Sequence, residues 1–209
     1  VLVDCGTFDW GAARHRYKTL VEPNMSYGGM RLAPTFGNMA FAIAARVMGL
    51  RDIGPAISPF NAFLILTGME TLALRMQRHC ENALATAQYL ESHPAVAWVN
   101  YAGLPSNPYN ALAQKIVPKG AGAVFTFGLK GGYDAGVALV SHLKLFSHLA
   151  NIGDTRSLVI HPASTTHRQL TDEQRTLAGA GADVVRLSVG IEDKADIIAD
   201  LAQALAKVA

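Results

Sequence analysis

The chain has 209 residues, of which half are apolar and 16% are charged, and its formal net charge is +2. This composition is typical of a folded globular protein with a sizeable core, and it excludes intrinsic disorder. The net charge is too small to indicate a nucleic-acid-binding surface. A short basic run at 14–18 is typical of a solvated loop.

Cys5 and Cys80 lie far apart without CxxC spacing, which predicts neither a disulfide framework nor a zinc site. We therefore expect a reducing, cytoplasmic location. No apolar run approaches the ~20 residues of a membrane-spanning helix, and no segment at the start resembles a signal peptide. The residues from Val1 to Asp4 are typical of the end of a strand, so we expect the sequence to be the later part of a longer one.

Residues 1–58 are the least regular part of the chain. A turn-rich segment at 6–11 and a stretch rich in glycine and proline precede a helix predicted over 38–48, with Gly49 as its end. An irregular segment of this length is usually functional or packed against a partner. It is a candidate insert at the mouth of a site.

Ser58 and Pro59 indicate a helix start, because serine caps the first turn and proline tolerates its first position. Apolar residues at spacings of three and four predict one helix from Pro59 to about Glu91. Gly68 predicts close packing or a bend. Its methionine and aromatic side chains are expected in the core.

The hydrophobic pattern of the sequence changes after Pro94, where it predicts short strands that alternate with amphipathic helices. We expect an α+β or α/β sandwich of one sheet and one helical layer. Val137, Val140 and Leu143 are expected to face inward, and Thr171 opens a capping box. The predicted strands are 96–101, 123–127, 157–160 and 184–189, and the predicted helices are 110–117, 133–146 and 195–208.

The strand at 184–189 places Arg186 on a half-buried face by its period-two alternation. A desolvated guanidinium requires an anion, and its planar fork matches a carboxylate. Physical chemistry alone favours an internal Asp or Glu as the partner over a substrate carboxylate.

The loop from His161 to His167 is rich in hydroxyl side chains. Two histidines six residues apart could ligate a metal, but no third ligand lies at the spacing of a metal site. A rigid turn near a site entrance is the favoured interpretation. The sequence contains neither a glycine-rich phosphate loop nor a nucleophile elbow.

Several of these segments together resemble the pyridoxal-phosphate (PLP) enzymes of cysteine and methionine metabolism. The resemblance covers essentially the whole chain, and it implies the type I, aspartate aminotransferase-like transferase fold. Residues 1–58 would then end the PLP-binding large domain, and 59–209 would form an interdomain helix and the small C-terminal α/β domain. The matching segments are SLVIHPASTTH at 157–167, VRLSVGIED at 185–193, SPFNAF at 58–63, GMETL at 68–72 with Arg75 and Met76, and YAGLPS at 101–106.

The segment VDCGTFDW at 3–10 and the insert leading to LRDIGP at 50–55 resemble the O-acetylhomoserine sulfhydrylase branch of that family. The branch implies a γ-replacement that makes homocysteine or methionine from O-acetylhomoserine and sulfide or methanethiol. Methionine γ-lyases and cystathionine γ-synthases or lyases of the same family remain alternatives. So does a non-catalytic interaction domain.

Carried over residue by residue, the resemblance implies that Arg186 holds the substrate α-carboxylate and that Ser157 lies near it. Arg51 and Asp52 match a charged pair near the site entrance. No metal is implied.

The family's catalytic lysine lies in a segment that would precede this sequence, and none of the seven lysines here occupies a matching setting. We therefore expect PLP to be bound mainly by an N-terminal half of the same enzyme, with no catalytic residue in this chain. The isolated chain is expected to be inactive, and the resemblance implies a homotetramer.

Overall fold

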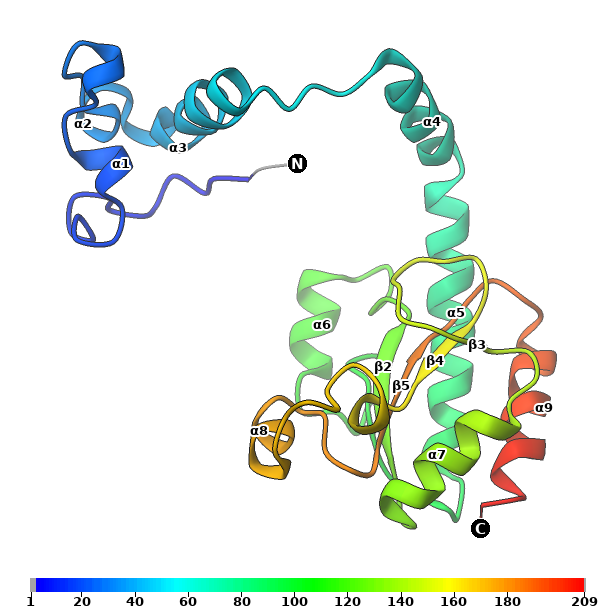
Figure 1. Cartoon of the computed structure of the whole chain (residues 1–209). Helices are drawn as coiled ribbons and strands as arrows, with labels where there is room; N and C mark the ends of the chain where they lie inside the picture. Colours follow the sequence, from blue (N-terminus) through cyan, green and yellow to red (C-terminus); the bar gives the residue numbers. More distant parts are fainter. Residues whose placement is uncertain (1–2, 209) are drawn as a thin grey trace. The chain divides into compact units, whose positions relative to one another are not determined.

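The computed structural model describes residues 3–208, which form two compact units divided between Leu66 and Thr67. Val1 and Leu2, half of the strand predicted at 1–4, lie outside the described residues. Val3 and Asp4 are not in a strand. Figure 1 labels helices and strands of both units.

The first unit consists of short helices around a small apolar cluster. Its buried members are Leu20, Val21, Leu32 and Ala44, and Trp10 packs against them. The stretch predicted to be irregular therefore contains ordered helical turns. The elements are α1 (Lys18–Val21), η1 (Met25–Tyr27), α2 (Leu32–Phe36), η2 (Gly37–Met39), α3 (Ala40–Ala44) and the π-helix η3 (Ala45–Asp52).

The helix end predicted at Gly49 is wrong, because η3 runs through that residue to Asp52. Gly54 follows instead in the left-handed region, with φ of 79°, and its N–H donates to the carbonyl of Leu50 at 3.0 Å. A glycine stops a helix only where the backbone takes this conformation.

The predicted long helix exists as two helices, α4 (Pro59–Glu70) and α5 (Leu72–Glu91). Ser58 caps α4 as expected, since its Oγ accepts the N–H of Asn61 at 3.1 Å. The interruption falls at Thr71, three residues after Gly68. Arg75 bridges it by donating to the Gly68 carbonyl at 2.5 Å, which satisfies a backbone oxygen near the break.

The expectation that the methionine and aromatic side chains of this helix lie in the core is wrong for α4. Phe63, Leu66 and Met69 are all more than half exposed, and α4 has no buried residue. Only from His79 onward does α5 bury a face. Periodicity indicates which residues share a face of a helix, but it does not identify what covers that face.

The second unit is a five-stranded sheet in the order β1-β2-β5-β4-β3. Every pairing is antiparallel except that of β3 with β4. The strands are β1 (Val96–Asn100), β2 (Val124–Leu129), β3 (Ser147–His148), β4 (Leu158–Ile160) and β5 (Val184–Ser188). Each main predicted strand is present within one or two residues, and β3 was not predicted.

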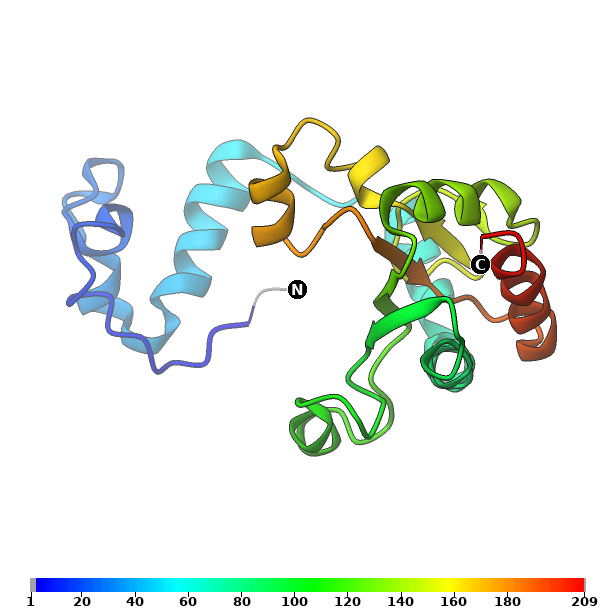
Figure 2. The same ribbon diagram turned by 90° about the horizontal axis from the view of Figure 1, so that it is seen from below.

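Helices α5, α7 (Gly132–His142) and α9 (Lys194–Leu205) cover one face of this sheet (Figures 1 and 2). The predicted helical layer on the sheet is therefore present. Helices α6 (Asn110–Ile116) and α8 (Asp172–Leu177) lie on the other side of the strands in Figure 2. The capping box predicted at Thr171 is also confirmed.

The core of this unit lies between the sheet and the three helices. Phe127, Val185 and Leu187 from the strands meet Leu139 and Leu201 from the helices, and all five are fully buried. On α7 the inward residues include Leu139 and Val140, whereas Val137 points outward with 37% of its surface exposed. The expected inward position of Val137 is therefore wrong.

Replacing Phe127 by alanine should lower the free energy of unfolding by about 3–5 kcal/mol, because the cavity opens at the centre of the core. Val137→Ala on the exposed side of α7 serves as the control and should change it by less than about 0.5 kcal/mol. Urea unfolding followed by circular dichroism measures both. Equal effects of the two substitutions would contradict this assignment of the core.

Candidate functional site

Arg186 lies at the centre of β5, paired with Thr126 of β2 on one side and Ile160 of β4 on the other. Its neighbours Val185 and Leu187 are buried against the helical layer. Side chains alternate along a strand, so Arg186 points to the opposite face of the sheet. The side chain is half-buried there.

Within residues 3–208, no carboxylate lies within ion-pair distance of Arg186, and no oxygen accepts a hydrogen bond from its guanidinium. The internal Asp or Glu that sequence physics favoured is therefore not present among these residues. The guanidinium keeps part of its surface exposed, and none of its nitrogens is among the fully buried polar atoms without a partner. A guanidinium that is accessible and not neutralised can bind an anionic ligand.

A shallow recess surrounds Arg186 on this face of the sheet. Its apolar walls include Leu158 and Ile160 from β4 and Leu149 from the loop that follows β3, and Ser188 lies beside them. In this chain alone the recess is too shallow to enclose a water molecule, so it marks the surroundings of Arg186 and not a formed ligand cavity. Asn151 and Ala150 complete the lining.

Ser157 does not line this recess. It is fully buried at the start of β4, where its hydroxyl donates to Glu192 Oε2 at 2.9 Å and accepts the N–H of Gly190 at 2.9 Å. Leu158 pairs with Ser188 and shares the Arg186 face, so the preceding side chain turns to the other face. Ser157 is therefore hydrogen-bonded to Glu192 and does not face the recess.

Arg51 and Asp52 lie at the end of η3 in the first unit and form an exposed ion pair at 3.9 Å. The Arg51 guanidinium also donates to the Tyr27 hydroxyl at 2.5 Å and lies 5.2 Å from the centre of that ring. The hydrogen bond with Tyr27 raises the pKa of Arg51 above its usual value. Both side chains are therefore held by neighbours within the first unit. Their expected place near a site entrance stays a prediction.

The histidine loop is a structural turn. His161 is buried, with Nδ1 at 2.9 Å from Ser164 Oγ and Nε2 at 2.8 Å from the Ala182 carbonyl, so both ring nitrogens are engaged. The ring also packs edge-on against Tyr133. Residues 3–208 contain no group of three metal-ligating side chains.

Two buried polar residues behind the strand, His79 and Asn82, were not predicted from the sequence. Both lie on α5. His79 Nδ1 is 2.6 Å from the Val189 carbonyl, and Asn82 Nδ2 donates to the carbonyls of Gly190 and Glu192. Both side chains are buried. Polar residues on the inward stripe of an otherwise apolar helix were the signal that could have identified them.

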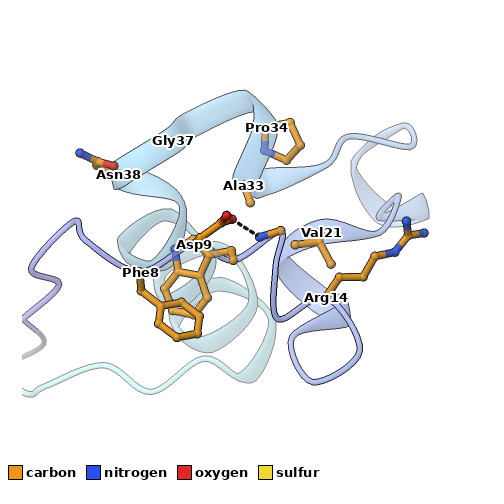
Figure 3. A pocket seen from close by; sticks show the side chains of 10 residues that line it. Phe8, Asp9, Arg14, Val21, Ala33, Pro34, Gly37 and Asn38 are labelled. Carbon is orange, nitrogen blue, oxygen red and sulfur yellow. Dashed lines mark hydrogen bonds between the residues drawn. The ribbon is translucent and has the colours of Figure 1, made fainter.

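A hollow of about 430 Å³ lies within the first unit (Figure 3). Phe8, Val21 and Pro34 form its apolar lining, and Arg14 extends along its edge in Figure 3. Asp9 accepts the N–H of Gly11 at 2.9 Å, so its carboxylate stabilises the turn that forms the wall. None of the site residues predicted from the sequence lines this hollow.

A larger hollow of about 820 Å³ lies between α5 and the loop at 117–120 in the second unit, and Cys80 lies on its wall. Tyr101 is buried close by, and its hydroxyl donates to the Gly122 carbonyl at 2.9 Å. Burial raises the pKa of Tyr101 to about 12, and the nearby Cys80 adds to the effect.

Since the pKa of Tyr101 in the folded chain lies above the value of about 10 in an unfolded chain, stability that is complete below about pH 10 should fall as the pH rises toward 12. Tyr101→Phe should remove the part of the stability loss at high pH that comes from ionisation of this hydroxyl. Urea unfolding between about pH 9 and 11 measures it, with Tyr109→Phe at an exposed ring as the control. Identical alkaline profiles for Tyr101→Phe and the wild type would contradict the assignment.

Comparison with known proteins identifies the class of protein to which this chain belongs. The mixed α/β structure resembles the crystal structure of a protein from Campylobacter jejuni assigned as an O-acetylhomoserine (thiol)-lyase, with a TM-score of 0.80 at 41% identity over 92% of this chain and 45% of that one. That structure contains N'-pyridoxyl-lysine-5'-monophosphate. The predicted PLP-dependent transferase fold is therefore confirmed.

A family model described as Cys/Met metabolism PLP-dependent enzyme matches residues 17–206. The chain belongs to this family, as the sequence predicted. It is 54% identical to O-acetyl-L-homoserine sulfhydrylase 1 of Thermus thermophilus and 53% identical to homocysteine synthase of Schizosaccharomyces pombe. Each match covers 98% of this chain and 48% of the relative, so the chain spans about half the length of these relatives.

Proposed function

We propose that this chain forms the C-terminal portion of a PLP-dependent transferase that makes homocysteine or methionine from O-acetylhomoserine and sulfide or methanethiol. Arg186 carries the proposal, because it is a half-buried guanidinium that no carboxylate of residues 3–208 neutralises. Relatives named for this chemistry support the choice of substrate.

Arg186 would bind the α-carboxylate of the amino acid with two parallel hydrogen bonds. The apolar walls of the recess would exclude water from this pair and strengthen it. Fixing the carboxylate also fixes the orientation of the Cα–H bond, so the contribution of Arg186 is positioning. The bound cofactor supplies the electron sink for breaking that bond and for the loss of acetate.

The lysines of this chain do not fit the attachment of PLP. All seven are exposed, whereas a lysine that forms an imine near neutral pH is usually desolvated or placed beside another cation. We therefore propose that the cofactor lysine, and most of the PLP contacts, belong to an N-terminal half of the same protein. This chain would contribute the substrate-binding Arg186, with Ser157 near it and with Arg51 and Asp52 at the entrance.

Helix α4 supports a partner of this kind. Phe60, Leu64, Ile65 and Leu66 are each more than half exposed, and exposed apolar surface of this extent is typical of an interface. We propose that the N-terminal half covers this helix. The homotetramer and the cytoplasmic location remain predictions. No helix within residues 3–208 has the length and apolar character needed to cross a bilayer.

The full-length protein loaded with PLP should form homocysteine from O-acetylhomoserine and sulfide, or methionine when methanethiol is the acceptor. Product formation measured with each acceptor tests this. The matched control is methionine alone, which should not be cleaved to 2-oxobutyrate. Methionine cleavage without sulfide-dependent homocysteine formation would instead favour a γ-lyase of the same family.

In the full-length protein, Arg186→Ala should weaken amino-acid binding by about 2–4 kcal/mol, because the substrate carboxylate loses a desolvated partner. PLP content should stay at the wild-type level, as measured by absorbance of the purified protein. Arg78→Ala, at an exposed arginine on α5 away from the recess, is the control and should bind normally. Loss of PLP with unchanged substrate affinity would contradict the proposed role.

A further inference from the structure

The loop at 149–156 forms one wall of the Arg186 recess, through Leu149, Ala150 and Asn151. Carboxylates hold the chain on both sides of this loop. At the near end, buried Asp200 of α9 accepts the backbone N–H groups of Lys144 at 2.9 Å and Leu145 at 2.8 Å, just before β3.

At the far end, Glu192 holds Ser157. Its Oε1 accepts the Ser157 backbone N–H at 2.6 Å, and its Oε2 accepts the hydroxyl at 2.9 Å. Within residues 3–208 no Lys, Arg or His forms an ion pair with Glu192. The carboxylate is therefore held by hydrogen bonds to the residue that ends the loop, and charge-assisted bonds of this kind are stronger than neutral ones.

Glu192 is itself fixed from behind by α5. Asn82 Nδ2 donates to the Glu192 carbonyl at 2.8 Å and to the Gly190 carbonyl at 3.0 Å, while His79 Nδ1 lies 2.6 Å from the Val189 carbonyl. Helix α5 therefore fixes the turn at 189–192. Through Glu192 this turn fixes Ser157, which ends the loop.

We infer that Glu192 is a positioning residue for substrate binding: by holding Ser157, it fixes the 149–156 wall against Arg186. The inference rests on the proposed role of Arg186 as the carboxylate ligand. Ser157 then acts through Glu192 and the loop, and its hydroxyl does not contact the substrate. Displacement of a positioning element by about 1 Å can reduce function about 100-fold.

Glu192→Gln in the full-length, PLP-loaded protein tests the inference. The amide nitrogen cannot accept a hydrogen bond, so one of the two bonds to Ser157 is weakened while the side-chain volume is kept. The KM for O-acetylhomoserine should rise about 10-fold or more, and kcat should change by less than about threefold. PLP absorbance and the melting temperature should stay near wild type.

Asp193→Asn is the matched control, because it removes the same charge one residue away. Asp193 is exposed and caps α9 through the N–H of Ala195, a role that asparagine also fulfils. Its KM should equal that of the wild type. Binding of norvaline, an amino acid without a leaving group at Cγ, should weaken in Glu192→Gln by the same factor as the KM rises.

An unchanged KM and norvaline affinity in Glu192→Gln would overturn the inference, as would an equal loss in Asp193→Asn. If Glu192→Gln does not fold, Glu192→Asp takes its place. A double-mutant cycle with Ser157→Ala gives the second measurement, since residues that act as one unit show strongly non-additive effects. Additive effects would overturn the inference.

The norvaline measurement separates this inference from the proposed reaction. It requires recognition of the amino acid, including its carboxylate by Arg186, but no loss of a group from Cγ and no turnover. A wild-type protein that binds norvaline but has no sulfhydrylase activity would refute the reaction and leave the role of Glu192 to be decided by the binding comparison.

Discussion

A guanidinium at the centre of a sheet, with no carboxylate beside it among residues 3–208, constrains the structure around it. Strand β5 must be long enough and well enough paired to hold Arg186 in place, and it pairs with β2 over residues 184–188 and with β4 over residues 186–188. The face behind it is fully apolar and packs on three helices. The core therefore provides the stability that an unpaired cation reduces.

This arrangement separates the two faces of one strand by function. The face toward the helices carries packing and the opposite face carries the proposed recognition of a carboxylate, which alternation along β5 makes possible with a few residues. The turn at 189–192 connects both roles, because α5 holds its backbone while Glu192 reaches the loop beside the recess. A change in core packing can therefore shift the loop beside Arg186 without contacting either.

Much of this fold could be predicted from the sequence, because strands such as β5 and helices such as α9 carry strong periodicity. The Thr171 capping box and the Ser58 cap were identified from short local signals. The errors at Gly49 and Val137 have different causes. A glycine ends a helix only in the left-handed conformation, and the inward side of α7 depends on tertiary packing that spacing alone does not determine.

The candidate site was only partly predictable. Arg186 could be identified because a charged residue interrupts an apolar strand, but the resemblance to a family was needed to name its anion. Ser157 was identified by the same resemblance, whereas its partner Glu192 lies 35 positions away and no local pattern connects the two. Contacts of this kind follow from strand register, which is a property of the whole sheet.

Gly190 has a consequence for how this protein can vary. A Cβ at this position would overlap the Thr155 carbonyl and the Ser157 nitrogen, and backbone atoms cannot rotate away as a side chain does. Even the methyl group of alanine would push the end of β5 away from residues 155–157. Position 190 should therefore be intolerant of every substitution in a saturation library, although the glycine itself carries no chemical group.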